Sequence, residues 1–338
     1  MKRRDFLKAS ISAPFLLSSV RGSDSFWRAR ESRPELYPSY LQAEKEGILK
    51  DRVEALLAYY ESCHLCPRNC RVNRLKGETG VCRATARVKV SSAFPHFGEE
   101  APLVGKRGSG TIFFSNCGLR CVYCQNYTIS INGEGVEISD EQLAEIMLKV
   151  QGFGCHNINL VTPTHYVPSI VRALRLACQK GLRIPLVYNT GGYENPEVIQ
   201  LLDGLVDIYL PDLKYSEPSM AAKFSEGAYN YPYYARLAIK EMYRQVGDLV
   251  VDERGVARRG LILRHLVLPH KVSGTKEVIR FIAEELSPTT YVNLMDQYRP
   301  EHRAHEFPEI SRRLKREEYQ EALKWARQYG LKRLDRGA

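Results

Sequence analysis

The chain has 338 residues, of which 44% are hydrophobic and 26% are charged, and its net charge is +10. No apolar run reaches the roughly 18 residues that a membrane span needs, so membrane-spanning, collagen-like and disordered classes are excluded. Residues 1–30 and 311–338 each carry a net charge of +5, which leaves residues 31–310 neutral. Because the basic residues gather at the two ends, we expect no binding of nucleic acid.

The first segment, residues 1–30, opens with Lys2, Arg3 and Arg4, and Phe6-Leu7-Lys8 follow after one residue. This pattern is typical of a twin-arginine export signal. A Ser-rich apolar stretch, residues 9–20, comes next and is too short to span a bilayer. We expect a signal segment here, and a basic N-terminus without that role is the alternative.

Regular elements follow in chain order. Residues 41–61 carry apolar side chains at helical spacing, which predicts one helix that ends just before Cys63. From about residue 110, short β-rich runs alternate with amphipathic stretches. The expected strands are 111–115, 157–161, 184–188, 206–210, 261–268 and 291–294. The expected helices are 140–151, 168–180, 196–202, 218–245 (interrupted near residue 231), 276–286 and 317–329.

Six apolar strands, each followed by a helix, are typical of a parallel sheet whose faces are covered by helices. Right-handed crossovers curl such a sheet into a full or partial barrel. The predicted fold class is therefore α/β, with a partial (β/α)6 barrel of parallel strands at residues 106–338. Residues 31–105 form a Cys-rich N-terminal extension in this prediction.

Seven of the nine cysteines fall between residues 63 and 124, in two groups. Cys117, Cys121 and Cys124 form a C-x3-C-x2-C set directly after the first barrel strand. Active sites of such barrels lie at the C-terminal ends of the strands. Three thiolates on one loop hold three irons of a 4Fe–4S cluster and leave the fourth iron open, whereas structural zinc takes four ligands. The spacing predicts an iron–sulfur cluster here.

This loop resembles the hallmark of the radical S-adenosylmethionine superfamily, with Tyr123 as the aromatic residue before the last cysteine. The resemblance extends to the subgroup described as similar to pyruvate formate-lyase activating enzyme. It rests on residues 63–70, 116–121, 123–126, 161–165, 188–193, 211–214, 264–269 and 295–300. One departure is the second strand end, where Thr162-Pro163-Thr164-His165 stands instead of a Gly-Gly-Glu-like turn.

The resemblance implies an enzyme that cleaves S-adenosylmethionine reductively and abstracts hydrogen from a substrate, such as a glycine of a protein. It also implies an external one-electron donor of the flavodoxin or ferredoxin type. The alternative is an iron–sulfur or zinc protein that transfers electrons or has a structural role, without cofactor cleavage. Two features point to different locations of the protein. The twin-arginine pattern favours the periplasm or cell envelope, whereas the use of a cofactor that is made in the cytoplasm favours the cytoplasm.

Further candidates lie at the predicted strand ends. We expect Tyr123 to lie against the adenine side of the cofactor. The candidates for holding its methionine and ribose parts are Thr162, Thr164, Asn189, Thr190 and Asp212. Lys214, two residues after Asp212, either pairs with it or contacts cofactor or substrate.

The other cysteine group is Cys63, Cys66, Cys70 and Cys82, whose four thiols suit a closed site. This group could bind zinc or a second cluster, or form two disulfides, and the sequence does not decide among the three. We expect its role to be structural.

Four more features have simple interpretations. Arg264 is expected in a buried ion pair, Cys155 and Cys178 as small buried residues, and His302 with His305 at the surface. Gln297, after the last predicted strand, is a candidate donor to an adenine or a carboxylate.

Overall fold

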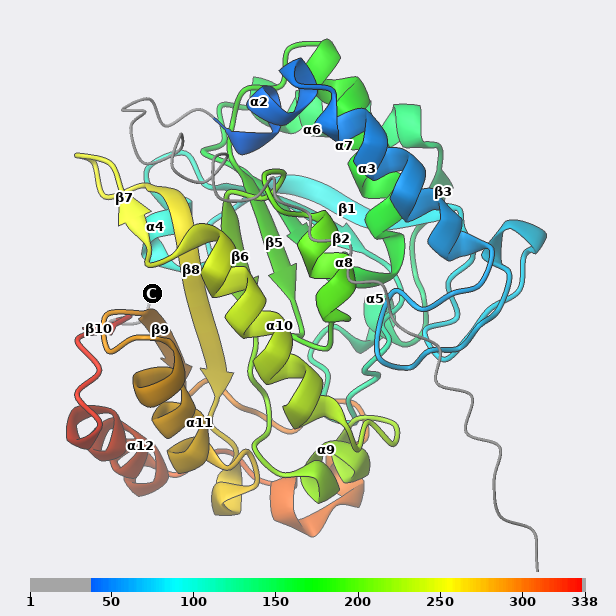
Figure 1. The fold of residues 1–338 in the computed structure, drawn as a ribbon. Coiled ribbons are helices and arrows are strands. Elements are labelled where there is room, and N and C mark those ends of the chain that lie inside the picture. Colours follow the sequence, from blue (N-terminus) through cyan, green and yellow to red (C-terminus); the bar gives the residue numbers. More distant parts are fainter. Residues whose placement is uncertain (1–37, 336–338) are drawn as a thin grey trace, which may run out of the picture. The chain divides into compact units, whose positions relative to one another are not determined.

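Parallel strands form the centre of the computed structural model, which describes residues 38–335 (Figure 1). The signal predicted at residues 1–30 lies outside these residues. All six predicted strands are confirmed, in parallel pairing and with chain order equal to spatial order. They are β2 (Ser109–Phe114), β4 (Ile158–Val161), β5 (Leu186–Thr190), β6 (Ile208–Pro211), β8 (Ala257–Leu266) and β9 (Tyr291–Met295). The α/β class with a mostly parallel sheet is thus confirmed.

Four strands were not predicted. β1 (Val88–His96) pairs antiparallel with β2, and β3 (Val136–Ile138) pairs antiparallel with β1. At the other end, β10 (Arg333–Leu334) lies parallel to β9, and β7 (Val250–Val251) is antiparallel to β8. The extension therefore supplies one strand to the sheet, in the same compact unit as the barrel residues.

The expected helices are present on the connections between the strands. The long stretch 218–245 is divided as predicted, and the stretch 276–286 ends in a π turn, Ile282–Leu286. The helices are α6 (Asp140–Gly152), α7 (Val167–Gln179), α8 (Pro196–Leu201), α9 (Pro218–Phe224), α10 (Tyr231–Val246), α11 (Thr275–Phe281) and α12 (Arg316–Gln328). Two short helices, α4 (Ala101–Val104) and α5 (Tyr127–Ser130), were not predicted.

Helix starts follow local chemistry. Ser139 accepts a hydrogen bond from the Gln142 backbone N–H at 3.2 Å, and the Gln142 side chain accepts from the Ser139 N–H at 2.8 Å. This capping box satisfies two donors that the first turn of α6 leaves without partners. Asn195 caps α8, where Pro196 stands at a position whose missing N–H costs nothing.

The single helix predicted over residues 41–61 is wrong. Two helices, α2 (Ser39–Lys45) and α3 (Ile48–Leu57), are separated at Gly47, and a 3-10 turn, Ala58–Tyr60, follows α3. Gly47 has a φ of 79°, in the left-handed region where glycine pays no steric penalty. The apolar spacing continues across this break, so periodicity alone does not reveal it.

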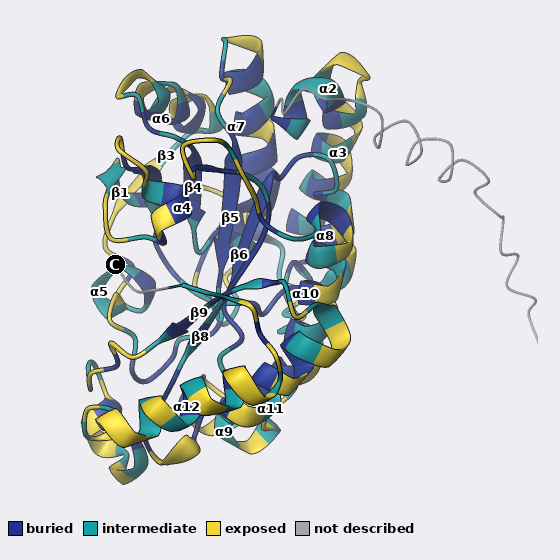
Figure 2. Cartoon of the chain, turned by 90° about the vertical axis from the view of Figure 1, so that its left-hand side faces the viewer, coloured by how far each residue is buried: buried dark blue, intermediate teal, exposed yellow. Residues whose placement is uncertain are grey.

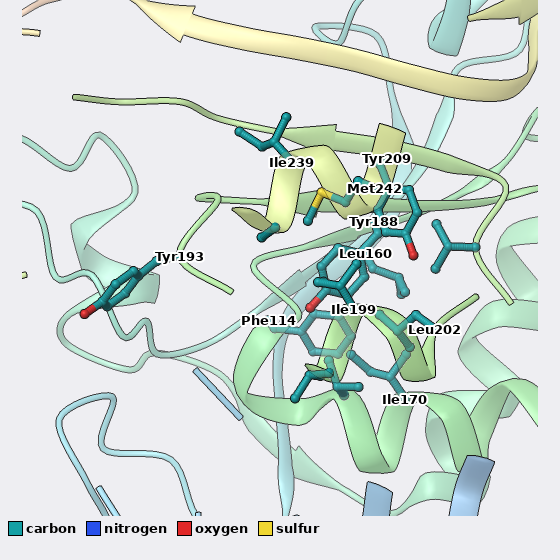
Figure 3. Packing of buried hydrophobic residues seen from close by; sticks show 14 of the residues in the cluster. Phe114, Leu160, Ile170, Tyr188, Tyr193, Ile199, Leu202, Tyr209, Ile239 and Met242 are labelled. Atoms are coloured by element: carbon teal, nitrogen blue, oxygen red, sulfur yellow. The ribbon is translucent and has the colours of Figure 1, made fainter. Parts of the chain in front are cut away.

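The core lies between the sheet and its helices. Figure 2 shows the central strands β4, β5 and β6 as buried and the outer faces of the helices as exposed. Leu160 pairs with Tyr188, and Tyr188 with Tyr209, across neighbouring strands. Ile199 and Met242, from α8 and α10, pack in the same cluster (Figure 3). Strands buried on both faces carry continuous apolar runs, which is why these strands were readily predicted. No helix within residues 38–335 combines the length and hydropathy needed to cross a membrane.

Candidate functional site

The C-x3-C-x2-C loop leaves β2 at the edge of the sheet where the parallel strands end. Asn116, the residue before the first cysteine, has a φ of 75° and donates its backbone N–H to the Ile129 carbonyl at 3.0 Å. Asparagine adopts this left-handed conformation more readily than most residues. The turn directs the chain away from the strand, so Cys117, Cys121 and Cys124 lie between β2 and α5.

Each thiol of this loop has a polar neighbour. Cys121 Sγ lies 3.1 Å from Ser225 Oγ, and Cys124 Sγ lies 3.1 Å from Ser130 Oγ. The Leu119 backbone N–H donates to Cys117 Sγ at 3.4 Å. Burial raises the pKa of all three thiols, while the Lys214 ammonium acts in the opposite direction on each. Hydrogen-bond donors and a nearby cation favour thiolates, the form that binds metal.

The donor set fits an iron–sulfur cluster better than a single metal ion. Within residues 38–335, no three His, Cys, Asp or Glu side chains converge closely enough to hold one ion. The cysteines of a cubane cluster bind different irons and therefore stand farther apart than ligands that share one ion. Three soft thiolates from one loop match a cluster with one iron left open to a small molecule.

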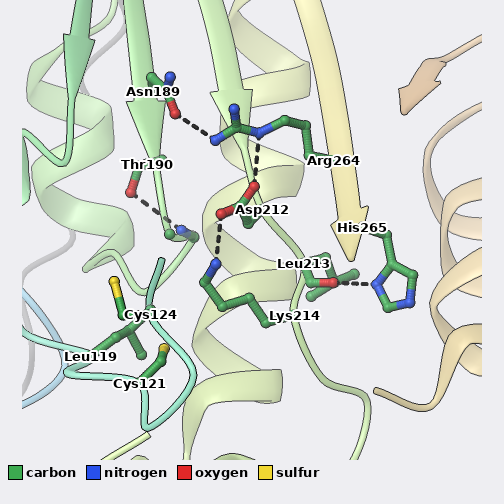
Figure 4. Close-up of polar contacts among 12 residues, drawn as sticks. Leu119, Cys121, Cys124, Asn189, Thr190, Asp212, Leu213, Lys214, Arg264 and His265 are labelled. Atoms are coloured by element: carbon green, nitrogen blue, oxygen red, sulfur yellow. Dashed lines mark hydrogen bonds and ion pairs between the residues drawn. The ribbon is translucent and has the colours of Figure 1, made fainter. Parts of the chain in front are cut away.

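Charged side chains lie near the ends of β6 and β8, beside the cysteine loop (Figure 4). Asp212 accepts from Arg264 Nε at 2.8 Å and from Lys214 Nζ at 2.7 Å. Arg264 also donates to the Asn189 side-chain oxygen at 2.6 Å, and Glu99 lies 3.6 Å from it. The buried ion pair predicted for Arg264 is therefore present. Of the two roles considered for Lys214, the pairing with Asp212 is observed.

These charges hold one another in place. Burial pushes the pKa of Asp212 upward, but Arg264 and Lys214 outweigh it, so the pKa falls below its ordinary value. Burial pushes the pKa of Lys214 downward, but Asp212 and then Cys121 outweigh it, so the pKa rises. Both groups stay ionised near neutral pH, because neither can lose its charge without leaving its partner buried and unpaired.

A pocket at the ends of β4 and β5 brings several predicted residues together. Cys117, Thr162, Thr164 and Thr190 all line it, beside Gly191. A side chain at Gly191 would place its Cβ 2.7 Å from Leu119, which also lines the pocket. Glycine at this position therefore allows the β5 end and the cysteine loop to approach closely. Asn189 and Asp212 lie next to the pocket, in the ion-pair network.

Thr162 has a φ of 60°, which is unusual for a β-branched residue. Its backbone N–H donates to the Asn189 carbonyl at 2.8 Å, so the strained residue is held by the neighbouring strand end. Strained residues of this kind cluster at ligand sites, where the surrounding structure maintains them.

Sequence reasoning missed Glu194, a fully buried carboxyl group beneath the pocket. Thr164 donates its hydroxyl to Glu194 at 2.5 Å, Thr190 donates to the same oxygen, and Tyr188 donates to the other oxygen at 3.3 Å. Burial raises the pKa of Glu194 to about 7, although these three donors act against the rise. A carboxyl group just after a strand end and Gly-Gly was the signal that could have revealed it.

Tyr123 is packed among other tyrosines. Its hydroxyl accepts from Tyr215 at 2.6 Å, and its ring meets the rings of Tyr215 and Tyr298 edge-on, at 6.4 Å and 6.0 Å between centroids. It does not line the pocket described above. The adenine contact expected for Tyr123 stays a prediction.

The extension reaches the same pocket. Cys66 and Cys82 line it together with Cys117. Arg68 donates to the Gly118 carbonyl at 3.0 Å and to the Ser225 carbonyl at 2.9 Å, which ties the extension to the cysteine loop. The two cysteine groups are therefore neighbours in space, a proximity that their separation in the sequence does not reveal.

The minor candidates lie apart from the pocket. Cys155 and Cys178 are buried as expected. His305 and Gln297 are exposed, whereas His302 is half-buried and stacks on Tyr127, with 5.2 Å between ring centroids.

Comparison with known proteins identifies the class. Residues 111–247, from β2 to the end of α10, match the Radical SAM superfamily. The chain therefore contains a domain of this superfamily, whose members are enzymes with radical-based reactions, and such a domain implies a 4Fe–4S cluster and S-adenosylmethionine. It is also 34% identical over 301 residues to the uncharacterized protein MJ0674 of Methanocaldococcus jannaschii, which covers 86% of this chain and 82% of that protein.

The raised pKa of Glu194 generates a prediction about stability. The unfolded chain releases this proton near pH 4.5, but the folded chain keeps it until about pH 7. Stability therefore falls by about 3 kcal/mol as pH rises through this window and is constant above it. Glu194→Gln mimics the protonated acid and should lack this loss, so its melting temperature should exceed that of the wild type above pH 7.

The measurement is thermal unfolding of both proteins, without cofactor, from pH 4.5 to 8. Glu197→Gln, at an exposed position on α8, is the matched control and should follow the wild type. A melting-temperature difference that does not change with pH would show that Glu194 titrates normally.

Proposed function

We propose that Cys117, Cys121 and Cys124 hold the 4Fe–4S cluster of this enzyme and leave one iron for S-adenosylmethionine. The observation that carries this proposal is the common pocket of Cys117 with Thr162, Thr164 and Thr190 at the strand ends. When bound there, a reduced cluster would supply the electron for reductive cleavage of S-adenosylmethionine, and the cleaved cofactor would abstract hydrogen from the substrate.

The chain's own side chains suit the two ends of the cofactor. Threonine hydroxyls and the Asn189 amide offer hydrogen bonds to the ribose hydroxyls and to the methionine amino group. The Asp212 carboxylate suits the cationic amino group, and Lys214 suits the methionine carboxylate. Because Arg264 and Lys214 hold Asp212 on two sides, its carboxylate is oriented before any cofactor enters.

Buried aromatic side chains limit the access of water to this site. The hydroxyl of Tyr231 lies 2.9 Å from both the Gly191 and the Asp212 carbonyl oxygens, which share its one proton, and Tyr215 donates to Tyr123. These hydroxyls are committed to protein partners within a buried region. Exclusion of water and of stray hydrogen donors directs the radical to its substrate.

The resemblance to glycyl-radical activating enzymes suggests the substrate. We propose that the hydrogen atom comes from a glycine of a partner protein and that a flavodoxin- or ferredoxin-like protein supplies the electron. The alternative of an iron–sulfur or zinc protein without cofactor cleavage is not favoured, because the chain contains a domain of a superfamily of radical enzymes.

The cluster assignment is tested by removing one thiol. Cys121→Ala should lose the electron paramagnetic resonance signal of this cluster and reduce 5′-deoxyadenosine formation to background, because the remaining two thiols cannot retain it. The assay is anaerobic reconstitution with iron and sulfide, followed by dithionite and S-adenosylmethionine. Cys155→Ala, a buried thiol outside both cysteine groups, is the control and should keep both. Cofactor cleavage by Cys121→Ala at the wild-type rate would remove this thiol from the ligand set.

The glycine assignment is tested by following the hydrogen. Protein extract labelled with deuterium at glycine Cα should transfer deuterium to 5′-deoxyadenosine during turnover, as measured by mass spectrometry. Transfer requires that the labelled C–H bond is the one broken. Extract labelled at alanine Cα serves as the matched control. Equal transfer from both labels, or from neither, would exclude a glycine substrate.

We propose further that residues 1–30 act as a twin-arginine signal, on the basis of their sequence pattern. Residues 1–40 fused to a reporter should direct its export, because the twin-arginine route carries proteins that fold and bind metal before export. Replacement of Arg3 and Arg4 by Lys should abolish that export. The measurement is reporter activity in the periplasmic fraction. Equal export with and without the arginines, or no export of either fusion, would refute the signal.

A further inference from the structure

The four cysteines of the extension are gathered by a network of backbone turns. The Cys63 N–H donates to the Val72 carbonyl at 2.9 Å, and the Arg71 N–H donates to the Cys63 carbonyl at 2.8 Å. A Cβ built at Gly80 would lie 2.5 Å from Cys70 Sγ, so the segment leading to Cys82 passes against Cys70. These contacts bring Cys63, Cys70 and the Cys82 segment to one place.

A buried cation lies among these thiols. Arg74 is only 3% exposed, and its guanidinium donates to Cys82 Sγ at 2.9 Å and to the His165 carbonyl at 2.6 Å. Its third nitrogen, Nε, has no hydrogen-bond partner. Within residues 38–335, no Asp or Glu side chain forms an ion pair with Arg74, in contrast to Arg264, which has Asp212. Among the described residues, the ionisable side chains that act on this guanidinium are the thiols of Cys82, Cys63 and Cys66 and the hydroxyl of Tyr60. Burial raises the pKa of Tyr60 so far that its hydroxyl stays neutral. The compensating negative charge must therefore come from the thiol groups.

A buried guanidinium without a compensating negative charge destabilises the folded chain. Neutral thiols do not remove this destabilisation. A metal centre with four thiolate ligands carries a net negative charge and therefore compensates it.

We propose that Cys63, Cys66, Cys70 and Cys82 bind a second 4Fe–4S cluster, for which Arg74 is the buried counter-ion. The four thiols do not stand at the close spacing of ligands that share one ion. The same is true of Cys117, Cys121 and Cys124, in a superfamily whose members hold a cluster. A cluster, whose ligands bind separate irons, fits this wider arrangement better than zinc does. Four ligands leave no iron open, so this cluster does not bind S-adenosylmethionine.

The two clusters would be neighbours across one pocket. Cys66 and Cys82 line it on one side and Cys117 on the other, and a Cβ at Gly118 would lie 3.7 Å from Cys66 Sγ. The inference extends beyond the proposed function, because it concerns thiols that the cofactor chemistry does not use.

The experiment isolates the second site. A chain with Cys117, Cys121 and Cys124 replaced by Ala is reconstituted anaerobically, and its iron, sulfide and zinc are measured. It should retain about four irons and four sulfides per chain, against about eight of each in the wild type. Adding Cys63→Ala and Cys82→Ala to this triple variant should remove the remaining iron and sulfide. Adding Cys155→Ala and Cys178→Ala instead should leave both in place. Because the triple variant lacks the site proposed for S-adenosylmethionine, this result is independent of the proposed function.

Other outcomes would overturn the proposal. One zinc per chain in the triple variant would make the site a zinc site. If the four cysteines did not react as free thiols and no metal were bound, they would form two disulfides. If the triple variant is insoluble, the iron content of the reconstituted wild type is the test. About four irons per chain in the wild type would leave none for a second cluster and would refute the proposal.

Arg74 provides a separate measurement. Arg74→Gln should make the reduction potential of the second cluster more negative, because a buried positive charge favours the reduced, more negative cluster. Arg74→Lys keeps the positive charge and should therefore shift the potential less than Arg74→Gln does. Arg83→Gln, which removes an exposed charge next to Cys82, is the matched control and should change the potential little. An unchanged potential in all three variants would remove Arg74 from the site.

Discussion

Burial of charge at the strand ends is the constraint on which the rest of this site depends. Asp212 is nearly inaccessible to solvent and bears a negative charge only because Arg264 and Lys214 contact its two oxygens. Removing either cation would leave a buried charge uncompensated, which is far more costly than losing a surface ion pair. The network therefore fixes the relative positions of β6 and β8, and through Asn189 it includes β5.

The pocket adds a second type of polar group to this charged network. Glu194 is surrounded by hydroxyl groups and has no cation among its hydrogen-bond partners, so burial dominates and keeps its proton on to about pH 7. Asp212, which follows the next strand along the chain, is also buried, but its pKa falls below the ordinary value. The difference comes from their partners: hydroxyl groups for one and cations for the other. The two carboxyl groups thus present a neutral and a charged region to one site.

Much of the fold could be predicted because its signals are local. Four of the six central strands, β2, β4, β5 and β6, are buried almost throughout, and their apolar runs differ plainly from the amphipathic helices between them. β1 could not be predicted in this way, since most of its residues are only half-buried and it contains Pro95. The break at Gly47 also escaped prediction, because apolar periodicity continues on both sides of it.

The site shows the same division. The C-x3-C-x2-C spacing points to its own chemistry, so Cys117, Cys121 and Cys124 could be singled out from the sequence. The burial of Glu194 and the separation of Arg74 from carboxylates result from tertiary packing, and no local sequence pattern predicts either feature. The proximity of Cys66 to Gly118 likewise joins segments about fifty residues apart. Spacing identifies ligands that share a loop, whereas charge balance between distant segments becomes visible only in the folded chain.

β1 also has a thermodynamic consequence. It begins shortly after Cys82 and pairs along its length with β2, which runs directly into Cys117. A ligand that binds only the folded arrangement of either cysteine group stabilises the chain by mass action, and the hydrogen-bonded ladder transmits this stabilisation to the other group. Binding at one cysteine group should thus raise the affinity of the other group for its ligand. The empty protein should therefore bind its first ligand more weakly than the half-filled protein binds its second.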